Sequence, residues 1–186
     1  VNLQGDEPFA PPAGIRAVHG HVLACQYRLA LLGRPAHFIT WLREPVERVV
    51  SHYHYWRHGY AGDDPAQPLR NRMLREDWSL ERFCLGPEMR DLYRQYLWGF
   101  APRRFAFIGL TEHYAEDLAR FARDWLGRPP PSVERVNAGP SRPPLDPALR
   151  DAIERHHARD VALYRWAVAQ RAAGWPALAP GPPHVP

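Results

Sequence analysis

The residues best suited to bind an anion lie close together in residues 40–53, which read T-W-L-R-E-P-V-E-R-V-V-S-H-Y. Arg43 offers a guanidinium group, whose forked N–H donors match the oxygens of phosphate and sulfate. Ser51 adds a hydroxyl donor further along the same segment. Helical rise would place Ser51 roughly 12 Å from Arg43 at the helix start, so the spacing alone does not show that both side chains reach one anion.

The charged residues of this segment also have a plain structural interpretation. Arg43 and Arg48 can form surface ion pairs with Glu44 or Glu47, and exposed pairs of this kind are common. From the residues alone, both the ion pairs and an anion site stay open. For Arg48 the structural role is preferred.

Two histidines upstream of this segment are candidates for proton transfer. His19 and His21 stand in the run H-G-H-V, and in an extended chain both side chains would point to the same side. Histidine is suited to take a proton from a hydroxyl near neutral pH, so His19 and His21 are both candidates for a catalytic base. A structural pair and a metal-chelating pair are the alternatives, and the absence of matching cysteines makes a metal the weaker one.

The other histidines are assigned structural roles. His52 and His54 repeat the His-x-His spacing, but they are expected on a helix as packing or surface residues. The pair His156 and His157 is expected at the surface.

A strand–turn–helix unit is predicted to position Arg43. The apolar run 37–42 is typical of a short buried strand, and Pro45 follows at the first position of a helix. Arg43 would then lie at the carboxyl end of a strand, where ligands bind in open α/β sheets. The first turn of the helix is expected to offer unpaired N–H groups and a positive dipole end to an anion.

The remaining pattern predicts an α/β fold with a parallel sheet flanked by helices. Residues 105–110 (F-A-F-I-G-L) are a second predicted strand, and Thr111 is expected to cap the helix after it. Further helices are expected over 69–84, over 88–98 and in one last helix from Asp146 and Pro147. Residues 1–174 are predicted to form one domain, followed by a Pro-rich tail over 175–186.

The composition limits the classes of function. All 24 basic residues of the 186 are Arg, and the net charge is +4. Genomic base composition and selection for anion recognition are the two competing explanations of this bias. Two cysteines are too few for a disulfide framework or a cysteine-based metal site. The sequence contains no run of about 18 apolar residues, so no transmembrane segment is predicted. The arginines are not gathered into the stripe expected of a nucleic-acid module.

The motif at 40–53 resembles the 3′-phosphate-binding motif of sulfotransferases that use 3′-phosphoadenosine-5′-phosphosulfate (PAPS). That motif reads L-R-D-P-x-x-R-x-x-S-x-Y in the carbohydrate branch, and Glu44 here replaces its Asp. The H-G-H-V run is similar to a segment of heparan sulfate 2-O-sulfotransferase and related uronyl sulfotransferases, and residues 107–112 are similar to the I-G-L-T-E strand and turn of the same family. By this resemblance Arg43 and Ser51 would hold the 3′-phosphate of the donor.

The same resemblance implies further roles. His21 would be the catalytic base and His19 its partner, while Arg135 and Arg142 would touch donor phosphates. It also implies a P-loop-like sulfotransferase fold and a bacterial, cytoplasmic enzyme that moves a sulfuryl group from PAPS, without a metal, to a hydroxyl-bearing acceptor, a carbohydrate above all.

The chain departs from this family where the family carries its phosphosulfate loop. That strand and loop, with its lysine, would lie before residue 1, and the chain has no Lys. Because charge stabilisation is a large catalytic term, weak donor binding and little turnover are expected of this chain. One rival hypothesis is a non-catalytic relative that binds an anionic glycan or nucleotide. Another is a small kinase, against which the lack of a G-x-x-x-x-G-K-[ST] motif argues.

Overall fold

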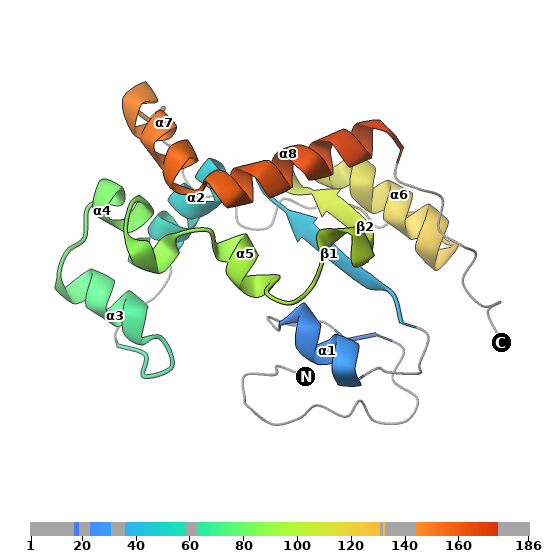
Figure 1. Cartoon of the computed structure of the whole chain (residues 1–186), viewed down its shortest axis with the longest axis horizontal. Helices are drawn as coiled ribbons and strands as arrows, with labels where there is room; N and C mark the ends of the chain where they lie inside the picture. Colours follow the sequence, from blue (N-terminus) through green and yellow to red (C-terminus); the bar gives the residue numbers. More distant parts are fainter. Residues whose placement is uncertain are drawn as a thin grey trace.

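A two-stranded parallel sheet flanked by helices organises the computed structural model, which describes residues 17–18, 23–30, 36–58, 63–130, 132 and 144–174 (Figure 1). The strands are β1 (Phe38–Leu42) and β2 (Phe105–Leu110). This arrangement confirms the predicted α/β class and the parallel pairing. The predicted strand over 37–42 begins one residue later than expected.

The register of the sheet brings the carboxyl ends of both strands to one edge. Leu42 pairs with Leu110, and one irregularity interrupts the ladder between Phe38 and Ile39. The indole of Trp41 lies directly against the backbone of Gly109, where any side chain on residue 109 would overlap it. A small residue in a strand often marks such a close approach.

Between the strands, the chain forms several short helices. Their bounds are α2 (Pro45–His58), α3 (Pro68–Arg75), α4 (Leu80–Cys84), η1 (Pro87–Met89), α5 (Leu92–Tyr96) and η2 (Pro102–Arg104). The helix predicted over 69–84 is therefore broken. Asp77 adopts a positive φ of 44°, and the Ser79 side chain caps α4 by accepting from the Arg82 N–H at 3.1 Å. The helix predicted over 88–98 is reduced to α5.

The remaining helices are α1 (Ala24–Ala30), η3 (Thr111–His113), α6 (Tyr114–Leu126), α7 (Pro147–His156) and α8 (Ala158–Ala172). Asp146 caps α7 as predicted, because its side chain accepts from the Leu149 N–H at 2.9 Å. The cap predicted at Thr111 is wrong, since its hydroxyl donates to the Leu42 carbonyl at 3.1 Å. The single last helix predicted from Asp146 is also wrong, because it breaks at His157 into α7 and α8.

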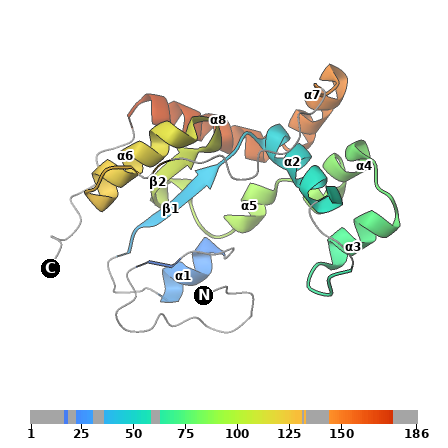
Figure 2. The same ribbon diagram turned by 180° about the vertical axis from the view of Figure 1, so that it is seen from behind.

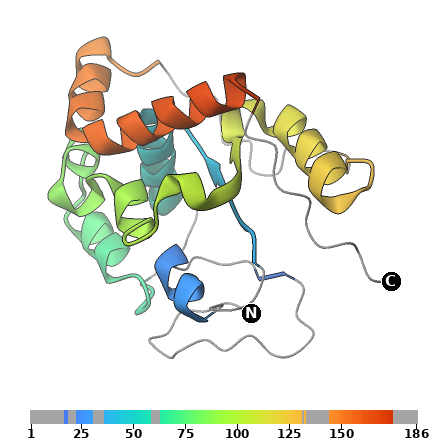
Figure 3. The ribbon, with the colours of Figure 1, turned by 45° about the vertical axis from the view of Figure 1, so that its right-hand side comes forward.

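Two apolar clusters hold these elements together. One lies where α2, α3, α4 and α7 meet, at one end of the molecule in Figures 1 and 2, and its fully buried members include Val46, Met73, Phe83 and Ile153. The other joins the sheet to α8, which crosses the strands in Figure 3, through Leu42, Tyr93, Ile108, Leu110 and Ala167. Burial of a side chain of this size contributes about 1.5–3 kcal/mol.

No helix in the described part of the chain combines the length and the apolar character that crossing a membrane requires.

Candidate functional site

The candidate site is the shared carboxyl edge of the two strands. Arg43 and Glu44 follow β1, and Thr111 and Glu112 follow β2. The Glu44 N–H donates to Glu112 Oε1 at 2.8 Å. The hydrogen bond from the Thr111 hydroxyl to the Leu42 carbonyl is a second link between the ends of the two strands. The Tyr164 hydroxyl of α8 donates to Glu112 Oε2 at 2.9 Å. Three segments that are far apart in sequence, the ends of the two strands and α8, are thereby fixed around one edge.

The beginning of α2 is capped by the protein itself. Glu44 accepts from the Val46 N–H at 3.1 Å and from the Glu47 N–H at 2.9 Å through its two carboxylate oxygens. The prediction that this turn offers unpaired N–H groups to an anion is therefore wrong at these two positions. A carboxylate already complements the positive end of the helix dipole.

Arg150 of α7 neutralises the acidic residues of this turn. Its guanidinium lies 3.2 Å from Glu44 Oε2 and 3.1 Å from Glu47 Oε1. The alternative in which Arg43 and Arg48 pair with these glutamates is not the one that the structure adopts. The neighbouring carboxylates therefore leave the Arg43 charge uncompensated.

Arg43 is half-buried, and its peptide is held by one phenol. The Arg43 N–H donates to the Tyr93 hydroxyl at 2.7 Å, and that hydroxyl donates to the Arg43 carbonyl at 2.9 Å. Within the described part of the chain, the Arg43 guanidinium forms no ion pair. Its backbone is thus anchored while its charge remains available to a ligand.

The other residues predicted from the same motif lie further along α2. The guanidinium carbon of Arg48 lies 4.5 Å from the centre of the Tyr93 ring and 5.8 Å from that of Tyr96, so Arg48 contacts aromatic rings in place of the expected ion pair. Ser51 is half-buried on α2. The structure shows no contact between the Ser51 and Arg43 side chains among the residues it describes, so their shared ligand stays a prediction.

Four predicted site residues, His19, His21, Arg135 and Arg142, lie outside the described residues. Of the remaining histidines, His52 packs as predicted, with its ring 4.3 Å from Trp56 and 5.8 Å from Phe83. Burial and the Arg48 charge lower the pKa of His52 to about 4.

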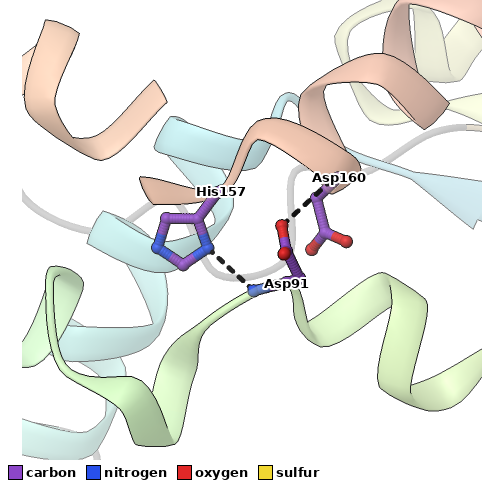
Figure 4. Close-up of side chains that lie close together, drawn as sticks. All are labelled: Asp91, His157 and Asp160. Carbon is purple, nitrogen blue, oxygen red and sulfur yellow. Dashed lines mark hydrogen bonds between the residues drawn. The ribbon is translucent and has the colours of Figure 1, made fainter. Parts of the chain in front are cut away.

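The surface position predicted for His156 and His157 is wrong for His157, which is only 2% exposed. It lies beside Asp91 and Asp160, as Figure 4 shows, and the three offer ligand atoms within 4.8 Å of one another. No signal in the sequence marks this group, because the residues lie 66 and 69 positions apart along the chain.

The bonds of this group are those of a helix clamp. Asp160 accepts from the N–H groups of Tyr93 and Arg94 at the beginning of α5, at 2.8 and 3.1 Å. Asp91 accepts from the N–H groups of Arg159 and Asp160 at the beginning of α8, at 3.2 and 3.3 Å. Each aspartate therefore supplies the acceptors that the other helix needs at its amino end.

His157 completes this clamp as a neutral imidazole. Its Nδ1 accepts from the Asp91 N–H at 3.2 Å, which places the ring proton on Nε2, 2.8 Å from the Cys84 carbonyl. Burial lowers the pKa of His157, which favours this neutral form. A metal at this position would have to displace the backbone donor from Nδ1, so we assign the group to the structure of the protein and not to a ligand.

Comparison with known proteins gives a limited set of relatives. No protein-family model matches the chain, and no solved structure matches it. A 3-deoxy-manno-octulosonate cytidylyltransferase of Xanthomonas campestris pv. campestris strain B100 is 38% identical over 88 residues, covering 40% of this chain and 31% of that protein. The proteins of that name from strains 8004 and ATCC 33913 are 36% identical over 88 residues, covering 40% of this chain and 35% of each. The chain thus spans about a third of the length of these curated relatives.

These relatives overturn the sulfotransferase interpretation. Their name is that of a nucleotidyltransferase, and no sulfotransferase family matches the chain. The expected sulfuryl transfer, the expected PAPS co-substrate and the metal-free chemistry expected with it are therefore withdrawn. The motif at 40–53 misled because a strand, an arginine and a helix beginning with proline suit many anion sites.

Proposed function

We propose that the chain binds the phosphate of a cytidine nucleotide at the carboxyl edge of β1 and β2, as part of a cytidylyl-transfer function. The observation that carries the proposal is the half-buried charge of Arg43 at the end of a parallel strand, which has no ion-pair partner among the residues that the structure describes. A guanidinium in this place is suited to phosphate, because ligands of open α/β sheets bind at the carboxyl ends of their strands.

The pairing of the carboxylates at this edge is compatible with an anion beside Arg43. Glu44 and Glu47 are paired with Arg150, and Glu112 accepts from the Tyr164 hydroxyl and from a backbone N–H. Burial and the Glu112 carboxylate raise the pKa of Tyr164, so this phenol stays protonated as a donor. The carboxylates nearest Arg43 are thereby satisfied before a ligand arrives.

The relatives supply the class of nucleotide and of acceptor. Their name specifies a cytidylyl group and 3-deoxy-manno-octulosonate, which is a sugar acid. We extend both to this chain as proposals, and the sugar acid retains the carbohydrate acceptor expected from the sequence. His21, with His19 beside it, stays a prediction for the base, because transfer to a hydroxyl requires removal of its proton. The P-loop-like form of the sheet also stays a prediction.

The experiment is a calorimetric titration of CTP and of ATP into the chain. We expect CTP to bind more tightly than ATP, and Arg43→Ala to weaken CTP binding about tenfold or more, the effect of losing a charge-assisted contact. Arg104→Ala is the matched control, since Arg104 is exposed on η2 before the amino end of β2. It should leave the affinity unchanged.

Two results would contradict the proposal. If the parent chain is folded and does not bind CTP, the proposed function is wrong. Equal weakening by Arg43→Ala and Arg104→Ala would show that binding follows the net charge of the chain and not a site at the strand edge. Ser51→Ala tests the second predicted contact in the same titration, with a loss of affinity expected.

A further inference from the structure

The Tyr93 hydroxyl forms hydrogen bonds with both backbone polar groups of Arg43, the N–H and the carbonyl. It accepts from the Arg43 N–H at 2.7 Å and donates to the Arg43 carbonyl at 2.9 Å. Tyr93 is 8% exposed, and burial raises its pKa to about 12. The phenol is therefore neutral at working pH, and only the neutral form can donate and accept together.

Tyr93 is itself held in place from two directions. Its N–H donates to Asp160 Oδ2 at 2.8 Å, which ties it to the first turn of α8. The Arg48 guanidinium lies over its ring at 4.5 Å. Because Tyr93 is held at its backbone and at its ring, its hydroxyl has a fixed position from which to bond the Arg43 backbone.

Arg43 lies where the chain leaves the sheet, between the end of β1 and the beginning of α2. Its own peptide groups lie beyond the last pair of the sheet register, Leu42 with Leu110. The Tyr93 hydroxyl supplies the partners that the neighbouring strand does not. Without it, both the N–H and the carbonyl of Arg43 would need water or a new arrangement.

We infer that Tyr93 is a positioning residue, which fixes the backbone of Arg43 so that its guanidinium is preorganised for the nucleotide phosphate. The inference rests on the proposed function and adds to it a residue from a different element, α5. Preorganisation raises affinity because less side-chain and backbone freedom is lost on binding. Tyr93 acts through Arg43 and does not itself touch the ligand.

The test is a double-mutant cycle on CTP affinity with Arg43→Ala and Tyr93→Phe. Phenylalanine keeps the ring and its contact with Arg48 and removes only the hydroxyl. We expect Tyr93→Phe to weaken binding about fivefold to tenfold in the parent, the effect of losing one or two hydrogen bonds. In the Arg43→Ala background it should have no further effect, since coupled residues are non-additive.

A merely structural hydroxyl predicts a different result. It would lower the midpoint of urea unfolding and leave the CTP affinity unchanged, which would overturn the inference while the proposed function stands. Equal losses with and without Arg43 would also overturn it, because Tyr93 would then act independently. If Arg43→Ala leaves the affinity unchanged, the proposed function fails and the inference fails with it.

Two further variants serve as a control and as a replacement for Tyr93→Phe. Tyr114→Phe is the control, because Tyr114 is 44% exposed and its hydroxyl forms no hydrogen bond with any residue that the structure describes. It should bind like the parent. If Tyr93→Phe does not fold, Asp160→Asn loosens the same tyrosine at its backbone. It should weaken CTP binding only while Arg43 is present, and an equal loss in the Arg43→Ala background would overturn the inference.

Discussion

Replacing Asp160 by alanine should destabilise the protein severely, because it removes the acceptor for two helix N–H groups at once. The carboxylate accepts from Tyr93 and Arg94 at 2.8 and 3.1 Å and is 3% exposed, and its bond to the Tyr93 N–H is buried. An N–H left buried without a partner costs about 1–3 kcal/mol. Burying the carboxylate has its own cost, since burial raises the pKa of Asp160. We expect a net loss of about 3 kcal/mol for Asp160→Ala.

The assay is urea unfolding followed by circular dichroism, with the slope checked for a two-state transition. Asp160→Asn keeps one carbonyl oxygen and should lose about half as much stability as Asp160→Ala. Asp151→Ala is the matched control, because Asp151 is exposed on α7, and it should stay within about 0.5 kcal/mol of the parent. An Asp160→Ala variant as stable as this control would refute the reciprocal capping.

The same samples separate the clamp from a metal site. If Asp91, His157 and Asp160 only cap helices and bond the backbone, an excess of chelator should leave the unfolding midpoint of the parent unchanged. Binding to the folded state alone stabilises a protein by mass action. A midpoint that falls with chelator and recovers with a divalent cation would show that these residues hold an ion.

Two more predictions concern packing and pH. Gly109→Ala should destabilise the protein by about 1–3 kcal/mol in urea unfolding, because the added methyl would overlap the Trp41 indole, with Cδ1 2.7 Å away. A loss below about 0.5 kcal/mol would mean that the ring moves aside. Lowering the pH from 6.5 towards 4 should reduce stability by up to about 1.4 kcal/mol per unit, because the unfolded chain binds a proton that folded His52, with its pKa lowered to about 4, does not. His52→Leu should reduce this slope without abolishing it, because burial also lowers the pKa of His157, and an unchanged slope would contradict the assignment to His52.

The features that the sequence predicted correctly are local ones. The apolar runs that form β1 and β2 carry the β-branched and aromatic residues that suit strands. Pro45 begins α2 and Asp146 caps α7, because each signal acts within a few residues of itself. The position of Arg43 at the end of a strand followed from the same local pattern.

The helix ends that the sequence mispredicted depend on partners that are distant in sequence. The last helix breaks at His157 because its imidazole bonds the Asp91 N–H and the Cys84 carbonyl, 66 and 73 residues away. Helical periodicity continues through this position, so only the packing of α5 and α4 against it reveals the break.

Residue types and spacing by themselves determined that this chain forms an α/β fold with a guanidinium at the end of a buried strand. Tertiary structure alone decided what surrounds that charge. Arg150 pairs with the glutamates that could have paired with Arg43, and the Tyr93 hydroxyl bonds the Arg43 backbone from 50 residues away. Periodicity and capping rules are local, whereas the choice of an ion-pair partner is settled by which side chains the fold brings within bonding distance.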